Sequence, residues 1–580
     1  MRKLAFLAVA LALVVSACSS NPGPSNGPVS QQRDTLLIPS GEPLTLDPHL
    51  VTDAGSHGYT VLLYAKLVRL EPAFYDKNGE LVAVGIDTTK EDMIARLQKG
   101  ELTASAVVVP DLAEAIPSPV VNDNGTVSYT FTIKENAKFS NGRAVTANDM
   151  AYSLDRAADP RTRSSTAELY LGDIVGVMDM QRGRIINRVS PQQDKVTIDL
   201  TGVEVLDERT IRITTLANSV SPELFMMKLT YEVASVVDKV QTEGPGRWTD
   251  RPNSTGPWIM VKRDVAEIVM EPNPNYFGHK PEIKRLVFYI SGGSTFLRYQ
   301  NGEVHFTGVG VDDLDVLKDV RDPSSELSRQ YFEMTEMTTS YIGFNTRTPP
   351  FDDPLVRQAF AMAVDKESIA RDILQNLAIP AKGILPPGMP GYRPDYKGLE
   401  YNPAKARELL AQSSYGNNLP RIKITISGSG SAPSVVLQSI VQFWKSNLGV
   451  EVEIEQVDYA TFLEQLKKGT FQMYSLGWVA DYPDPDNYFM KFESWRSSAN
   501  NEARYSNEEV DALIQEARIE MDPQKRLQLY RQIEDIVVSD APWITLFHSK
   551  DSLLVKPFIC GYYPTPMGIS ILSYVSFCDS

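Results

Sequence analysis

Residues 421–478 alternate between strand-like and helix-like patterns, and no other stretch of the chain restricts the fold so strongly. Apolar and polar residues alternate at 422–426, as in a strand with one buried face. Segments of helical composition end at Gly449 and at Gly469, and glycine commonly follows the last turn of a helix. The predicted order is strand, helix, strand, helix and strand, at residues 422–426, 435–448, 450–454, 461–468 and 471–476. This order predicts a parallel sheet covered by helices.

The segment after the third of these strands, Gly477 to Asp486, is where we expect a ligand. In helix-covered parallel sheets, ligands bind beyond the carboxyl ends of the strands. Asp481 follows Trp478 by three residues. A carboxylate beside an indole in a partly dry pocket is suited to hold an ammonium ion. A role for Asp481 as the cap of a turn is the alternative.

The three aspartates of this segment, Asp481, Asp484 and Asp486, also raise the question of calcium. A calcium-binding EF-hand loop needs a glycine turn and a late glutamate. Here Pro483 and Pro485 separate the aspartates and the segment from 481 to 486 has no glycine. We therefore predict a rigid turn with solvated carboxylates, and no metal site.

Capping residues mark the predicted starts of three helices. They are Ser506 with Glu509, Asp522 with Pro523, and Asp352 or Asp353 with Pro354. We expect these helices to be structural.

The first eighteen residues have the layout of a secretory signal. Arg2 and Lys3 precede an apolar run of twelve residues, shorter than the roughly 20 residues that span a membrane. Small residues and Cys18 follow, an arrangement that resembles the lipobox of bacterial lipoproteins, in which the cysteine is acylated. We predict a signal peptide at 1–17, lipidation of Cys18 and a flexible Ser-, Asn-, Pro- and Gly-rich linker up to residue 33. An ordinary signal peptide with a chance cysteine is the alternative.

The composition argues against several classes of function. The 580-residue chain has a net charge of −16, which disfavours nucleic acid as a partner. Its five histidines do not have metal-ligand spacing, and the sequence has neither a G-x-S-x-G elbow nor a P-loop. We predict no metal, no cofactor and no catalytic residue. A Ser-His-Asp triad assembled in space stays open, because triads are recognised by geometry.

The other two cysteines, Cys560 and Cys578, lie near the C-terminus. Disulfides persist in exported proteins, so we predict a structural bridge between them. Two reduced cysteines in the core are the alternative.

A set of short motifs, in a shared order along nearly the whole mature chain, resembles the family 5 extracellular solute-binding proteins, the oligopeptide- and dipeptide-binding lipoproteins of ABC importers. Each motif is weak alone, and their common order carries the resemblance. The motifs are Leu46-Asp47-Pro48-His49, Pro110 to Glu114, Tyr129 to Lys134, Phe139 to Gly142, Thr146 to Asp149, Ser254 to Trp258, Asn273 to Tyr276, Asn301 to Glu303, Phe344-Asn345, Val356 to Ala359 and Ala363 to Asp365.

The resemblance implies an α/β fold, a two-lobed periplasmic-binding-protein clamp of type II with an extra domain, built of mixed sheets flanked by helices. The ligand would lie between the lobes. Lobe I would combine residues 34–70, 205–325 and 540–580, the extra domain would be 71–204, and lobe II would be 326–539.

The resemblance also implies site residues. The family's amine-binding aspartate sits in a Gly-Trp-x-x-Asp segment, matched by Gly477, Trp478 and Asp481. Asp481 would pair with the α-ammonium of a peptide, and the backbone of Gly477 and Val479 would bond its main chain like an added strand. Ala54 would face the ligand from lobe I. Tyr482 is expected to line the pocket, with a place in the core as the alternative.

The expected function is capture of short peptides by an extracytoplasmic, lipid-anchored monomer that delivers them to the permease subunits of an ABC transporter. Another small solute, such as an oligosaccharide or a metal complex, is an alternative cargo. A secreted hydrolase, or a surface protein that uses the same clamp for adhesion or sensing, is the alternative from another class.

Overall fold

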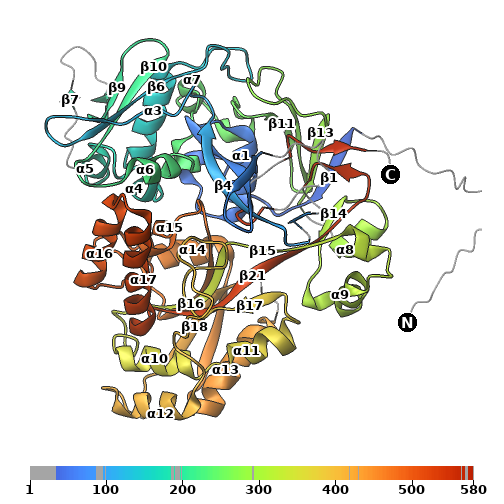
Figure 1. Cartoon of the computed structure of the whole chain (residues 1–580), viewed down its shortest axis with the longest axis vertical. Helices are drawn as coiled ribbons and strands as arrows, with labels where there is room; N and C mark the ends of the chain where they lie inside the picture. The colour runs from blue at the N-terminus through green and yellow to red at the C-terminus, as the bar shows by residue number, and fades with distance from the viewer. Residues whose placement is uncertain are drawn as a thin grey trace, which may run out of the picture. The chain divides into compact units, whose positions relative to one another are not determined.

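The predicted strand–helix alternation forms part of the largest sheet of the protein (Figure 1). The computed structural model describes residues 34–85, 96–97, 99–183, 188–189, 196–197, 199–290, 293–416, 418–428, 430, 432–562, 565–568 and 572–578. The elements of this segment are β18 (Ile422–Ser427), α13 (Val435–Leu448), β19 (Val452–Val457), α14 (Tyr459–Lys468) and β20 (Met473–Val479). Both helices end where expected, at Gly449 and Gly469, which adopt the left-handed conformation with φ of 71° and 66°.

The third strand begins later than predicted. Phe471 lies before it, and its ring stacks on Phe462 of α14 at a centroid distance of 5.2 Å. The strand instead continues to Val479, because it pairs with β16 (Thr338–Phe344) along its whole length. Phe471, which the sequence pattern places in the strand, therefore packs against the preceding helix.

The sheet as a whole is mixed. β18 is parallel to β19 and β20, as predicted. β16 and β21 (Trp543–Val555) are antiparallel to their neighbours and come from distant parts of the chain. The path of the sheet is β14 (Phe306–Gly308), β21, β16, β20, β18 and β19, and β15 (Tyr331–Thr335) and β17 (Ala378–Pro380) also pair with β21.

Both faces of this sheet are covered by helices. Alternate residues serve the two faces, as Ile342 and Tyr341 of β16 illustrate by belonging to different core clusters. One face packs against α10 (Pro354–Met362), α12 (Pro403–Gln412) and α13, and the other packs against α14, α16 (Glu508–Ile519) and α17 (Pro523–Asp540). The sheet thereby holds the end of β20 in a rigid, apolar frame.

Three further sheets come mainly from the first half of the chain. They are β1 (Thr35–Pro39), β13 (Arg285–Tyr289), β12 (Glu267–Pro272) and β11 (Trp258–Arg263); β5 (Val120–Val121), β6 (Val127–Thr132), β10 (Thr210–Thr215) and β9 (Val203–Val205); and β3 (Leu81–Val84), β2 (Val68–Asp76) and β4 (Leu102–Pro110). β2 crosses the predicted boundary at residue 70, and β10 pairs with β6 across the one at residue 204. The domain boundaries stay a prediction.

Two of the three predicted helix starts agree with the structure. Asp522 caps α17, and Asp353 caps α10. The third prediction is wrong in its residue, because Asn507 and not Ser506 caps α16 by accepting hydrogen bonds from the N–H groups of Glu509 and Val510. Asparagine and serine are comparable caps, so the pattern alone did not separate them.

Among the described residues, no helix has the length and apolar character needed to cross a membrane. The predicted signal peptide, the lipidated Cys18 and the linker up to residue 33 lie outside the described residues.

Candidate functional site

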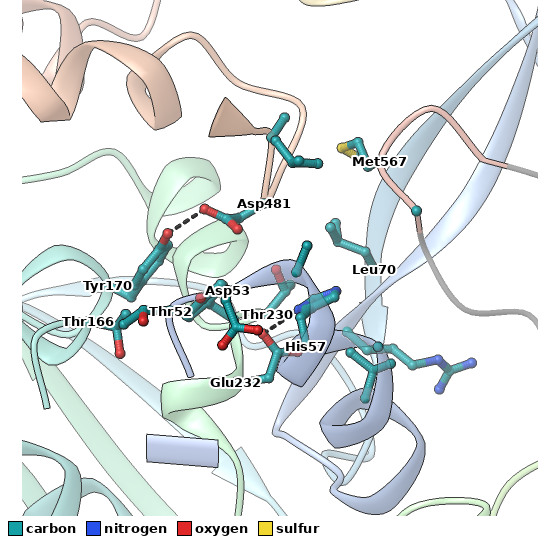
Figure 2. A pocket seen from close by; sticks show the side chains of 18 of the residues that line it. Thr52, Asp53, His57, Leu70, Thr166, Tyr170, Thr230, Glu232, Asp481 and Met567 are labelled. Carbon is teal, nitrogen blue, oxygen red and sulfur yellow. Dashed lines mark hydrogen bonds and ion pairs between the residues drawn. The ribbon is translucent and has the colours of Figure 1, made fainter. Parts of the chain in front are cut away.

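A cavity of about 500 Å³ opens at the end of β20, where the sequence predicted a ligand. Its volume is within the range of small-molecule sites. Its wall combines segments that are far apart in the sequence, most of them within 52–72, 165–170, 230–232, 459–481, 491–502 and 566–574. Figure 2 shows side chains from several of these segments around a common space.

Asp481 presents a partly bonded carboxylate at the cavity wall. The Tyr170 hydroxyl donates to its Oδ2 atom (Figure 2). The Asn487 amide donates to the same atom at 3.0 Å. Its Oδ1 atom accepts no hydrogen bond from any described residue. Removal from bulk water raises the pKa of this carboxyl to about 6, and the two donated bonds offset only part of that rise. A cation at Oδ1 would therefore find an acceptor that is positioned and poorly solvated.

Asn487 holds the Asp481 segment in place, and sequence reasoning missed it. Its Oδ1 atom accepts from the Trp478 indole N–H at 2.9 Å and from the backbone N–H of Asp481 at 3.1 Å. Its amide then donates to the Asp481 carboxylate. One side chain on the short helix α15 (Asp486–Phe489) thus orients both residues that the sequence singled out. No sequence pattern around Asn487 predicts this role.

Three stacked rings lie next to the Asp481 carboxylate, and the first of them, Tyr170, donates to it. Tyr170 stacks on Tyr231 at 3.9 Å between ring centroids, and Tyr231 stacks on His57 at 6.4 Å. Tyr170 comes from the predicted extra domain, whereas Tyr231 and His57 come from segments assigned to lobe I. The stacked rings and Asp481 therefore bring together residues from all three predicted domains, which no local pattern predicts.

The stacked rings end at a buried ionic group. His57 Nδ1 lies 2.8 Å from Glu232, and Lys66 lies 3.3 Å from the other oxygen of that carboxylate. Burial opposes a charge on His57, but Glu232 outweighs it and raises the pKa of the imidazole. Burial likewise opposes a charge on Glu232, but the two basic groups lower its pKa to about 2. The charges of His57, Lys66 and Glu232 are therefore paired with one another.

The outer edge of β20 is free to pair at Gly477 and Val479. The N–H of Ala480 donates to the Met337 carbonyl at 2.8 Å, in register with the β16 pairing. Because peptide groups alternate in direction along an antiparallel strand, those of Gly477 and Val479 point away from β16. β18 pairs only with the first two residues of β20, so no described strand lies beside Gly477 or Val479 on that side. The cavity is thus bordered by an unpaired strand edge.

Trp478 forms part of the wall with one face against a cation. Lys491 Nζ lies 4.3 Å from the indole ring centroid and donates to Glu502 at 2.7 Å. The indole is therefore held by Asn487 at its edge and by Lys491 at its face.

Most of the predicted site residues line the cavity, and one does not. Gly477, Trp478, Val479 and Asp481 belong to the wall, as does Ala54, the first residue of α1 (Ala54–Leu63). The remaining residue, Tyr482, lies in the core instead. It is fully buried, and its hydroxyl lies 3.3 Å from Asp486. Its ring packs in the same apolar cluster as Tyr170 and Met490.

The expectation of solvated carboxylates at Asp484 and Asp486 is wrong. Both are buried, and Arg526 and Arg518 pair with them at 2.5 Å and 2.6 Å. The arginines come from α16 and α17, more than thirty residues later in the chain. No group of described residues has the arrangement of a metal site.

The C-terminal segment contributes to the cavity wall. Cys560 and Cys578 are joined by a disulfide, as the sequence suggested. Five described residues between them line the cavity, and the Pro566 carbonyl accepts a hydrogen bond from the Met337 N–H at 2.7 Å. The five are Pro566, Met567, Gly568, Ser573 and Tyr574. The bridge therefore closes a loop that belongs to the site, a consequence that the sequence did not reveal.

Comparison with known proteins relates this architecture to one family. The profile described as bacterial extracellular solute-binding proteins, family 5 Middle, matches residues 107–500. Heme-binding protein A of Haemophilus influenzae is 30% identical over 81% of this chain and 84% of its own length. Periplasmic oligopeptide-binding protein OppA of Salmonella typhimurium is 29% identical over 75% and 79%.

A solved structure gives the same fold. The Escherichia coli murein tripeptide binding protein MppA superposes with a TM-score of 0.75 at 23% identity, over 95% of this chain and 99% of that one. The predicted fold class, the type II periplasmic-binding-protein fold with mixed sheets flanked by helices, is confirmed.

Proposed function

The chain belongs to the bacterial extracellular solute-binding proteins of family 5, and from this we propose that it captures short peptides in the cavity and delivers them to the permease subunits of an ABC importer. Members of this family bind solutes outside the cytoplasm rather than transform them. The relatives whose names include peptide binding support the choice of cargo.

The observation that carries the proposal is the Asp481 carboxylate at the cavity wall. A peptide has one ammonium group at its N-terminus, and Oδ1 of Asp481 is an acceptor with no described partner. The ammonium would form a charge-assisted hydrogen bond there, with a carboxylate that is largely removed from bulk water, where such a bond is strong. Asp481 is thus the proposed amine anchor.

The free edge of β20 supports a peptide over other amine-bearing solutes. An extended peptide that starts at Asp481 runs beside Gly477 and Val479, whose peptide groups point away from β16. Main-chain hydrogen bonds of this kind do not depend on the ligand's side chains. The site would accept many peptide sequences.

Lipid anchoring at Cys18 completes the proposal. The linker of fifteen residues from Ser19 to Arg33 reaches roughly 20 Å as a random coil. A loaded protein on this tether would stay close to the permease, which raises its effective concentration there.

Mass spectrometry of ligands retained by the purified protein tests the proposed function. After incubation with a mixed peptide pool and gel filtration, we expect intact peptides in the protein fraction. Cleavage products that follow the protein would instead favour a hydrolase. A retained oligosaccharide, metal complex or haem, with no peptide, would replace the proposed cargo.

A further inference from the structure

The basic side chains of the cavity wall differ in whether a carboxylate pairs with them. Among the described residues, four lysine or arginine side chains contribute to the wall, and three of these have a carboxylate partner in the wall itself. Lys66 lies 3.3 Å from Glu232, Arg69 lies 2.8 Å from Glu71, and Lys491 lies 2.7 Å from Glu502. The fourth is Lys467.

Lys467 has no ionic partner among the described residues. No described carboxylate lies within ion-pair distance of its ammonium, and the ammonium donates no hydrogen bond to a described residue. Burial lowers the pKa of Lys467, Glu502 and Asp53 oppose this fall, and nearby Lys491 adds to it. A cation that is partly desolvated and unpaired is costly, and an anion from a ligand would remove that cost.

Lys467 and Asp481 are held by one structural unit. Lys467 lies in the last turn of α14, and β20 follows after a four-residue connection. Leu466, Phe471 and Ala480, which flank the two charged residues and the connection, belong to the same apolar cluster. The separation between the cation and the anion is therefore set by a packed core rather than by a flexible loop.

We propose that Lys467 receives a carboxylate of the ligand while Asp481 receives its ammonium, so that the cavity selects short peptides with both charges. This inference rests on the proposed function. The carboxylate would come from the C-terminus of the peptide or from an acidic side chain, since both offer the same chemistry.

Glu502 provides the competing explanation for Lys467. Its Oε1 atom accepts a hydrogen bond from Lys491, but its buried Oε2 atom has no hydrogen-bond partner in the part of the chain that the structure describes. A rotation of Lys467 toward Oε2 would pair the two residues within the protein and leave no cation for a ligand. The two explanations differ in how affinity depends on the ligand's carboxylate.

The test uses a tripeptide library in three forms: free acids, C-terminal amides, and amides with one internal glutamate. Retained peptides are identified by mass spectrometry, and titration calorimetry then measures the affinity of the best binder in each form. We expect the full-length protein to bind the acid at least tenfold more tightly than the plain amide. Recovery of affinity in the glutamate-containing amide would assign the site to an acidic side chain.

Three variants complete the design. Lys467→Gln should lose about tenfold in affinity for the acid and no longer distinguish acid from amide, and Lys467→Arg should retain the distinction. Lys468→Gln is the matched control, because it removes the same charge from the same helix at an exposed residue that pairs with Glu464. It should behave like the unmodified protein.

Equal affinity of the unmodified protein for the acid and both amides would overturn the role of Lys467 while leaving peptide capture intact. The role of Lys467 would also be overturned if the Lys467→Gln variant still bound the acid more tightly than the amide. Absence of any retained peptide would overturn the proposed function as well, so the two failures are separable.

Discussion

Replacing Asp481 by asparagine should stabilise the ligand-free protein at alkaline pH. The pKa of Asp481 is raised from 3.8 to about 6, mainly by burial. Between these values the native state keeps a proton that the unfolded chain has released, so stability falls as pH rises through this window. At about 1.36 kcal/mol per pH unit, the shift of about two units costs about 3 kcal/mol at pH 8 and little near pH 4. Asparagine carries no such charge.

Thermal unfolding of the two ligand-free proteins at pH 4 and pH 8 measures this effect. At pH 8 the variant should melt higher by about 2–3 °C for a chain of this length, and the two curves should converge near pH 4. Asp486→Asn is the matched control, because Arg518 and Lys228 lower the pKa of Asp486 against its burial. That control should melt lower at pH 8. A variant Asp481→Asn that is destabilised at pH 8, or whose gain does not depend on pH, would refute the reasoning.

Three further predictions concern ligand binding. An ammonium at Asp481 displaces the proton of a carboxyl whose pKa is about 6, so peptide affinity should fall by up to about tenfold per pH unit below pH 6 and level off above pH 7; calorimetry across pH checks this, and a flat profile contradicts it. Asn487→Ala should weaken binding about tenfold, because the variant frees the Trp478 indole and one Asp481 oxygen; an unchanged affinity would exclude this positioning role. Cys560→Ser with Cys578→Ser opens the loop that lines the cavity, and should cost about 3 kcal/mol of stability and lower peptide affinity; thermal unfolding and calorimetry measure both, and an unaltered affinity would show that the loop is ordered without the bridge.

Local patterns predicted the elements around the site well. The two glycines after α13 and α14 end those helices as expected, because a left-handed residue is needed at that position. The order of strands and helices predicted a cavity at this place, since ligands bind beyond the carboxyl ends of parallel strands. Asp481 is a candidate ligand residue on the same grounds, and the family resemblance adds the expected roles of Gly477 and Val479.

Long-range partners were not predictable from the sequence. The sequence predicts solvated carboxylates at Asp484 and Asp486, whereas both are paired with arginines on α17 and α16, which follow much later in the chain. Tyr170, which donates to Asp481, comes from a segment more than three hundred residues earlier. Such contacts depend on how distant segments pack, and neither periodicity nor capping carries that information.

The affinity of one peptide, with its N-terminus free or acetylated, tests the amine anchor most directly. Calorimetry should show that acetylation weakens binding to the unmodified protein by about 1–3 kcal/mol, the scale of a lost charged hydrogen bond. For Asp481→Asn the free peptide should bind more weakly by a similar amount, and acetylation should then change little. Equal affinity of the two peptides for the unmodified protein would contradict the capture of peptides through Asp481.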